Sequence, residues 1–552
     1  MIKKIISTLG LGTLLALPID ASELYKNFEG YHTPNRELSQ FSAMVVDKNK
    51  VVAVGTFKTL SARFPEAKII DLNGKTLLPG LIDGHGHVTG LGLNLQRISL
   101  RDVASEEDSV AKVIEFSKNN PELSWIRGRG WNQELWPTKA FPTKKSLDEK
   151  IANKPVWLRR IDGHAGWANS KALALAGITR DSVSPPGGEI IRDSAGEPTG
   201  VLIDNAMDLL EAKIPSSSLG EVKNAISLAS AHLASIGITS VHDAGIGGQV
   251  YQAFGEMANN KQLPIRIYGM LSVTANDYPS MLKRGIVNTA DDQLVIRSVK
   301  ISADGALGSR GAAMIEPYSD DKENTGLLLH TPASLEKNMK RAIDAGFQVN
   351  VHAIGDKANH LALNYFEEFN KDKNSRALRH RIEHAQVVKT SDLSRFKTLD
   401  VLPSMQPTHA TSDMNMAENR VGHARIKGAY AWRTLLDDGV RVVSGSDFPI
   451  EYANPFYGLH AAVTRQNRQS QPPLGWLSHE SMTLSQALNS FTLDAAYGAH
   501  QDDVLGTLEP GKWADFIVID KNIFKAPMSQ IWQPKVLGTW VGGKKVYSAT
   551  KK

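Results

Sequence analysis

Two histidines one residue apart give the first chemical signal in this chain. His85 and His87 follow an apolar run that ends in Pro79 and Gly80. Because residues i and i+2 of a strand point to the same face, both imidazoles can reach one point. Neutral imidazole is a common ligand for zinc and related metal ions. The pair predicts either half of a metal site or a polar turn that follows a strand.

Further polar residues stand inside or directly after later apolar runs, namely Lys300, His352, His384 and Asp447. A lysine inside an apolar strand is costly to bury unless it has partners. Taken singly, a buried histidine is more often a satisfied core residue, and an aspartate before a proline-containing turn is often a cap. Together with His85 and His87, however, these residues stand in order at the ends of several apolar runs, one or two at each. This order indicates a shared metal site.

These side chains need a scaffold that brings many strand ends together. Apolar runs alternate with helical patterns along the middle of the chain, for example at 222–235, 334–345 and 430–437. We predict eight strands, at 80–85, 238–243, 265–271, 294–302, 347–352, 381–385, 401–405 and 440–446. Eight alternating units predict an α/β fold, a (β/α)8 TIM-like barrel. The active sites of such barrels lie at the C-terminal ends of the strands, where the candidate ligands fall.

The remaining chain is expected to form two additional units. Short β-branched runs near both chain ends are too small to bury a core alone. We therefore predict that residues 22–80 and 501–552 combine in one small flanking β-sandwich. The barrel would span residues 81–500, with residues 95–235 inserted after its first strand as a cap over the mouth. A lid of this kind excludes water and shapes the substrate pocket.

Composition restricts the classes of function. The net charge is +5 and the basic residues are scattered, so we expect no nucleic-acid partner. The chain has no cysteine, which excludes disulfides, thiolate zinc sites and a cysteine nucleophile. Lys3 and Lys4 precede an uncharged apolar run at 5–18, which predicts a secretory signal over residues 1–21 or an ordinary N-terminal helix. We expect a secreted or periplasmic protein with no stable membrane span after signal removal.

The motifs together resemble the amidohydrolase superfamily, and specifically its long-insert amidohydrolase-3 branch, which includes N-substituted formamide deformylases. The matching segments are 79–87, 160–173, 299–311, 351–356, 382–386, 406–409, 444–449 and 506–520. The resemblance implies one or two divalent ions, with zinc as the first expectation. His85, His87 and Asp447 would bind the buried ion, and His352 and His384 the outer ion. Lys300 would bridge the two as a carbamate if it is carboxylated, because an ammonium would repel two cations.

The same resemblance implies a small-molecule substrate and cleavage of a C–N bond, in an amide or N-acyl compound other than a peptide. Metal coordination lowers the pKa of bound water towards ~7 and so supplies hydroxide. Asp447 is the expected catalytic residue, taking the proton and passing it to the leaving nitrogen, unless it is only a ligand. The alternatives are an ester or lactone hydrolase, or a non-catalytic binding protein that retains the barrel. A homo-oligomer stays open.

Three more residues are candidates for substrate binding. His164 in the expected cap and His409 after the seventh strand could reach the substrate, or be structural. Arg310, after the fourth strand, could bind a substrate oxygen or brace a loop. Trp131 and Trp136 suit an aromatic pocket wall, although tryptophan is more often found in core packing.

Overall fold

The computed structural model describes residues 22–549 except 162, 164 and 187. The expected signal segment, residues 1–21, lies outside the described residues, so export stays a prediction. Among the helices of the described part, none is long and apolar enough to cross a bilayer.

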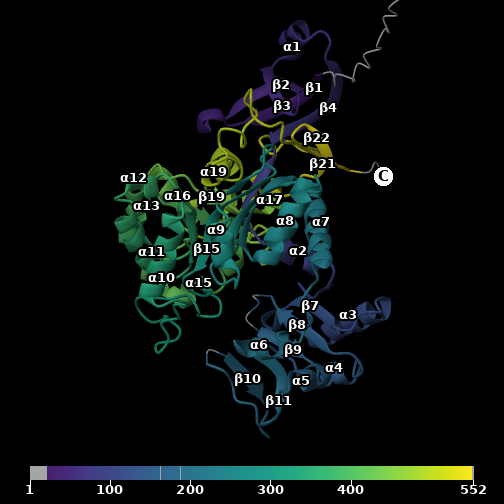
Figure 1. The fold of residues 1–552 in the computed structure, drawn as a ribbon, viewed down its shortest axis with the longest axis vertical. Coiled ribbons are helices and arrows are strands. Elements are labelled where there is room, and N and C mark those ends of the chain that lie inside the picture. Colours follow the sequence, from purple (N-terminus) through teal and green to yellow (C-terminus); the bar gives the residue numbers. More distant parts are fainter. Residues whose placement is uncertain (1–21, 162, 164, 187, 550–552) are drawn as a thin grey trace, which may run out of the picture.

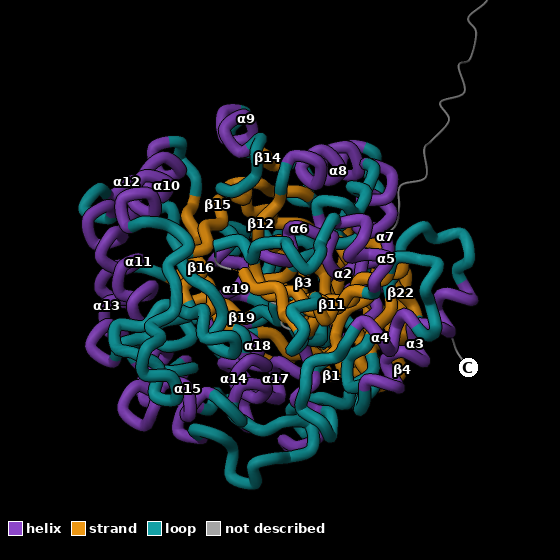
Figure 2. The backbone as a smooth tube through the Cα atoms, turned by 90° about the horizontal axis from the view of Figure 1, so that it is seen from below, coloured by secondary structure: helices purple, strands orange, loops and turns teal. Residues whose placement is uncertain are grey.

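A ring of parallel strands occupies the centre of the molecule, with helices around it (Figure 2). In spatial order the strands are β5 (Leu81–Gly86), β12 (Ile238–Ile246), β13 (Arg266–Ser272), β15 (Leu294–Ser302), β16 (Gln348–Ala353), β17 (Arg381–His384), β18 (Leu402–Met405) and β19 (Val443–Ser444). Every neighbouring pair along this path is parallel. The predicted barrel is confirmed, and each of its strands lies where the apolar runs placed it.

Amphipathic helices cover the outside of the ring. The main ones are α2 (Val88–Leu95), α7 (Leu219–Ser235), α8 (Gly248–Asn259), α10 (Pro332–Asp344), α11 (Asp356–Phe369), α13 (Leu393–Leu399), α14 (Pro407–Asp413), α16 (Trp432–Asp437), α17 (Pro455–Thr464) and α18 (Leu484–Ser490). Local sequence fixes where several of them begin. Ser218 and Glu221 form a reciprocal capping box at the start of α7, and Thr331 caps α10 ahead of Pro332.

The ring closes between β5 and β19 at a seam, which we define as residues 84–87 and 444–448. The backbone N–H of Asp447 donates to the carbonyl of His85 at 2.7 Å, and that of His87 donates to Phe448 at 2.8 Å. A Cβ atom on Gly445 would lie 2.4 Å from the backbone nitrogen of His85, so only glycine permits this approach. The seam therefore holds three predicted metal ligands by their own backbone.

Both chain ends join in one seven-stranded mixed sheet beside the barrel (Figure 1). Its order is β22 (Lys544–Ser548), β21 (Val536–Val541), β20 (Phe516–Ile519), β4 (Lys68–Pro79), β1 (Glu23–His32), β2 (Ser39–Asp47) and β3 (Lys50–Gly55). The predicted pairing of the two ends is confirmed. Strand β1 was not predicted, because polar residues interrupt it and a bulge follows Lys26.

A second sheet forms the unit inserted early in the chain, at the opposite end of the barrel from the first (Figure 1). Its strands are β10 (Gly188–Arg192), β11 (Pro198–Asp204), β9 (Ala165–Ala168), β8 (Val156–Arg160), β7 (Ile126–Trp131) and β6 (Ile98–Ser99), in that order. Helices α3 (Glu106–Asn119), α4 (Lys144–Asp148), α5 (Ser170–Ala176) and α6 (Ala206–Glu211) belong to it. We call this unit, residues 98–211, the cap. Helix α7, which falls inside the predicted insert, packs instead against α2 and α8.

The two cap tryptophans belong to its core. Trp131 and Trp136 are 0% and 2% exposed. Their indole nitrogens donate to the carbonyls of Leu158 and Val103. Core packing, and not a pocket wall, is therefore their role.

Candidate metal centre

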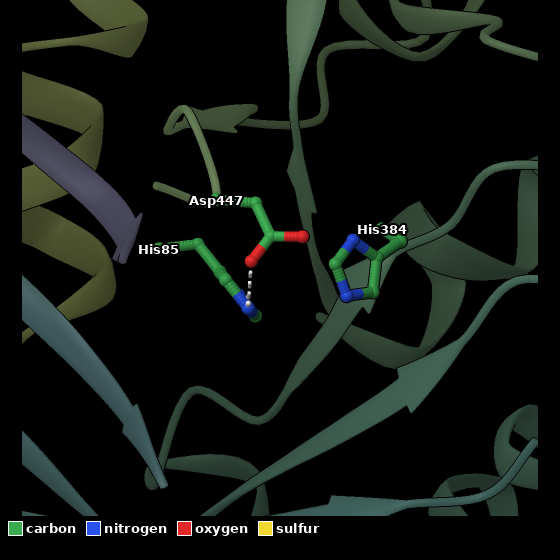
Figure 3. Close-up of side chains that lie close together, drawn as sticks. All are labelled: His85, His384 and Asp447. Carbon is green, nitrogen blue, oxygen red and sulfur yellow. Dashed lines mark ion pairs between the residues drawn. The ribbon is translucent and has the colours of Figure 1, made fainter. Parts of the chain in front are cut away.

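The predicted ligands converge at the C-terminal ends of the barrel strands. Figure 3 shows the side chains of His85, His384 and Asp447 turned towards one another from β5, β17 and the loop after β19. One ligand atom of each lies within 4.8 Å of the others, and all three residues are buried. His85 Nε2 is 3.7 Å from Asp447 Oδ1. This spacing suits atoms that share a bound ion.

The other predicted ligands surround this group. His87 Nε2 lies 3.1 Å from Asp447 Oδ1, and Lys300 Nζ lies 3.2 Å from His85 Nε2. The ring of His352 is centred 4.5 Å from that of His384. All six predicted ligands are thus brought to one place.

His409 also reaches the centre. Its ring stacks on His384 with 5.9 Å between centroids, and its Nε2 lies 3.7 Å from Asp447 Oδ2. The structure places it beside the side chain expected to move protons, on α14.

Backbone turns at the strand ends aim two of the ligands. His384, Ala385 and Asp447 have φ values of 75°, 42° and 57°, in the left-handed region that non-glycine residues rarely adopt. Each such residue costs roughly 1–2 kcal/mol, so the surroundings must hold it. For His384, a contact of 2.7 Å between Nδ1 and Gln406 Oε1 does so and leaves Nε2 for the centre.

A carboxylate absent from our sequence predictions orients His85. Glu383 Oε2 lies 2.5 Å from His85 Nδ1, which directs His85 Nε2 towards the centre. Burial alone would raise the pKa of Glu383, but Arg381 and His85 hold that pKa well below its usual range. A carboxylate behind a metal-binding histidine fixes its tautomer. Strand alternation carried the signal, since Arg381 and Glu383 share one face of β17.

Two more buried aspartates fasten the backbone around the ligands. Asp83 accepts from the Ser446 hydroxyl at 2.6 Å and from the His85 N–H at 3.1 Å, across the seam. Asp304 accepts the N–H groups of Ile354 and Gly355 at 3.0 and 2.8 Å, just beyond β16. Burial raises the pKa of each aspartate to about 7. Asp304 Oδ1 also lies 3.6 Å from His352 Nε2.

The electrostatics of the donor set fit a divalent metal. Burial, with the nearby Lys300, lowers the pKa of His85 to about 4 and that of His352 to about 3. These imidazoles are therefore neutral near pH 7, which is the form that binds metals. Burial would raise the pKa of Asp447, but the hydrogen bond with His87 and the adjacent imidazoles hold it well below its ordinary value. Neutral nitrogens around one carboxylate suit zinc and its neighbours.

The two other substrate-binding candidates, Arg310 and His164, are not among the residues described at the metal centre. Arg310 Nη2 lies 3.1 Å from Asp320 Oδ2 on the loop after β15, and Arg420 pairs with the same carboxylate. This contact corresponds to the loop-bracing alternative. His164 lies outside the described residues.

A cavity of about 460 Å³ opens between the barrel mouth and the cap. His87, Pro449 and Ile450 line it from the barrel, and β7 and β8 line it from the cap. The His87 side chain is 35% exposed, so the cavity meets the metal centre there. A small molecule held in it would lie against the candidate ligands.

Comparison with known proteins matches the chain along its length. A family profile described as "Amidohydrolase family" covers residues 68–547. Protein LONG AFTER FAR-RED 3 of Arabidopsis thaliana is 34% identical over 530 residues, covering 93% of this chain and 90% of that protein. N-substituted formamide deformylase of Arthrobacter pascens is 27% identical, with 92% and 95% covered. The crystal structure of an uncharacterized metal-dependent hydrolase from Pyrococcus furiosus superimposes with a TM-score of 0.73 at 30% identity, covering 91% of this chain and 99% of that one.

Proposed function

The chain belongs to the amidohydrolase family, and we propose that it is a metal-dependent hydrolase of C–N bonds in amide or N-acyl compounds other than peptides. The family match confirms the resemblance that the motifs carry. One observation carries the proposal furthest: ligand atoms of His85, His384 and Asp447 lie within 4.8 Å of one another in a buried site. The deformylase relative, by its name, acts on an N-substituted formamide, which favours the C–N bond over esters.

The side chains gathered in the site could hold two ions. His85 and His87 with Asp447 would hold one ion, and His352 with His384 a second. Lys300 stands beside His85 where a carbamate could bridge both. Divalent ions held by these residues would lower the pKa of a bound water molecule and polarise the substrate carbonyl. Zinc is the first candidate because the donors are nitrogens and oxygens of this kind.

Asp447 is positioned to move the proton. Its Oδ1 lies 3.1 Å from His87 Nε2, and its Oδ2 lies 3.7 Å from His409 Nε2. With its pKa held low, the carboxylate is ionised and able to accept a proton from the attacking water at Oδ2. The same oxygen then delivers the proton to the leaving nitrogen, which makes the amine a good leaving group. His409, beside Oδ2, is placed to contact the substrate during this transfer.

The direct test combines metal analysis with a substrate panel. Purified protein is assayed by elemental analysis and then, with zinc added, against amides, N-acyl amino acids, ureas and lactones. We expect up to two divalent ions per chain and turnover of C–N compounds that a chelator abolishes. Absence of any divalent ion, together with no activity after metal addition, would leave a binding protein. Turnover of lactones alone would move the reaction to the ester alternative.

A further inference from the structure

The cavity between the barrel and the cap has a strongly basic wall. Among the residues that the structure describes, the lining of this space of about 460 Å³ contains four arginines and one acidic side chain, Glu211. Arg127, Arg129 and Arg159 belong to the cap, and Arg97 directly precedes it. The opposite wall carries His87, which lies in the metal centre. The arginines and the centre therefore line the same cavity.

The register of the cap sheet explains why the arginines lie together. Strands β7 and β8 pair in parallel, with Arg127 opposite Trp157 and Arg129 opposite Arg159. Alternation places these side chains on one face of the sheet. Between them, Gly128 and Leu158 are buried towards the cap core. The basic face is thus the one that the cap turns to the barrel mouth.

Two of the four arginines, Arg97 and Arg127, have no acidic partner among the residues that the structure describes. Arg159 pairs with Glu211 at 3.3 Å, and the Trp157 indole nitrogen donates to the same carboxylate at 3.1 Å. Arg97 and Arg127 are half-buried, yet the side chain of neither makes a hydrogen bond or ion pair with any residue that the structure describes. Burial and the neighbouring Arg127 and Arg159 lower the pKa of Arg97 to about 10. Guanidinium groups crowded without a partner are stabilised when an anion binds between them.

We propose that the substrate carries a carboxylate that Arg97 and Arg127 bind, while its N-acyl bond reaches the metal centre past His87. This inference rests on the proposed function and names its substrate class, N-acyl compounds with a free carboxylate. The planar guanidinium matches a carboxylate through two parallel hydrogen bonds, which fixes orientation as well as charge. The basic wall also draws anionic substrates into the cavity.

Matched pairs of ligands test the proposal. N-acetyl and N-formyl amino acids are compared with the same compounds as primary carboxamides, both by calorimetric binding to the zinc-loaded protein and by hydrolysis. The acids should bind roughly tenfold to a hundredfold more tightly than the amides, and added salt should narrow the gap. Equal binding of acid and amide overturns the proposal. Tight binding of the acids without hydrolysis of any pair refutes the proposed function and leaves the carboxylate site standing.

Substitutions test whether Arg97 and Arg127 cause the preference for carboxylic acids over amides. In Arg97→Gln and Arg127→Gln, KM for the acids should rise roughly tenfold or more with kcat little changed. Values for the neutral amides should stay as in the wild type. Arg180→Gln is the control, because Arg180 is an exposed cap arginine that pairs with Glu197 and does not line the cavity. Melting temperatures verify that the variants fold. If both cavity variants keep the full preference for acids, the assignment is wrong.

Discussion

Asp447 is expected both to bind the metal and to move a proton, and one substitution separates the two tasks. Asp447→Asn keeps the size and one ligating oxygen and removes the proton acceptor. We expect much of the metal to remain while kcat falls by ~10²-fold or more. Because the lost interaction belongs to the transition state, kcat/KM should fall with kcat. A variant with full metal and near-normal kcat would make Asp447 a ligand only and direct the search for the base to His409.

Lys300 is a second residue whose chemistry can be read from a substitution. Its Nζ lies 3.2 Å from His85 Nε2, where an ammonium would oppose bound cations. If it bridges as a carbamate, Lys300→Ala should lose metal and activity, and short carboxylic acids should restore part of both. Lys512→Ala is the matched control, because Lys512 is also buried but bonds to the Leu505 carbonyl away from the centre. Full activity in Lys300→Ala excludes the bridge.

Glu383 acts on the metal through His85. Glu383→Gln should weaken zinc affinity by roughly 10- to 100-fold, the usual effect of removing a carboxylate behind a histidine ligand. Competition with a chromophoric chelator measures the change. Glu480→Gln is the control: Glu480 is equally buried, but it accepts the backbone N–H groups of Arg433 and Thr434 at the start of α16. That variant should lose stability and keep zinc affinity, and a similar loss of affinity in both would assign the effect to the fold.

Residue type and strand-end position were sufficient to find the residues that meet at the centre. The same two criteria did not predict the roles of Glu383 and Asp83. These side chains make hydrogen bonds to ligands and to backbone groups, and most of their partners are distant in the sequence. The turn at His384 was also hidden. Simple alternation puts Glu383 and His384 on opposite faces of β17, and only the positive φ of 75° returns the imidazole to the centre.

At the level of elements, the seam between β5 and β19 is the feature that sets ligand geometry. In Gly445→Ala, the new Cβ would lie 2.4 Å from His85 N and 2.7 Å from Asp83 Oδ1. The two strands must then separate, at a cost of about 1–3 kcal/mol, and His85 and Asp447 move apart. We expect lower unfolding free energy in denaturant and weaker zinc binding.

Gly255→Ala supplies the control for that substitution. A Cβ there meets nothing within 4 Å, and Gly255 lies in α8. This change should leave zinc binding unaltered and raise stability by up to about 1 kcal/mol. Unchanged zinc affinity in Gly445→Ala would show that the seam does not control the ligands.

Elements with strong periodicity were the predictable ones. The buried parallel strands read as continuous apolar runs, and capping residues mark the helix starts within a few positions. Strand β1, which lies between β4 and β2, was not predicted because a bulge breaks the alternation of its residues. The packing partner of α7 could not be predicted either. An apolar face indicates that a helix packs against something, but it does not indicate against which unit.

For the molecule as a whole, His32 links the two chain ends and makes that link sensitive to acid. Its buried Nδ1 accepts the backbone N–H of Leu508 at 3.3 Å. Burial lowers the pKa of His32 to about 4 from 6.5. Between these values the unfolded chain binds a proton that the folded protein does not. The contribution of neutral His32 to the unfolding free energy is therefore complete above about pH 6.5. It is lost as the pH falls to about 4, which lowers the unfolding free energy by up to roughly 3 kcal/mol.

Unfolding free energy measured against pH tests this link. His32→Gln should show a shallower fall between pH 6.5 and 4 than the wild type, whereas His423→Gln should follow the wild type because His423 is exposed. Other histidines whose pKa burial lowers to about 4, such as the buried His460 and the half-buried His500, contribute a similar slope to every variant. The test is therefore the difference between the two variants in the slope of unfolding free energy against pH. Parallel curves for both would contradict the assignment.

The flanking sheet also determines what can happen while the chain is being synthesised. Strand β4 needs β20 as its neighbour, yet β20 is made only after the cap and the barrel strands have been synthesised. Until then β4 presents an unpaired edge, which is a template for association between nascent chains. Contacts between such distant segments also form slowly. A ribosome that stops before residue 516 therefore releases a product with this edge uncovered, which makes incomplete chains of this protein natural clients for chaperones and proteases.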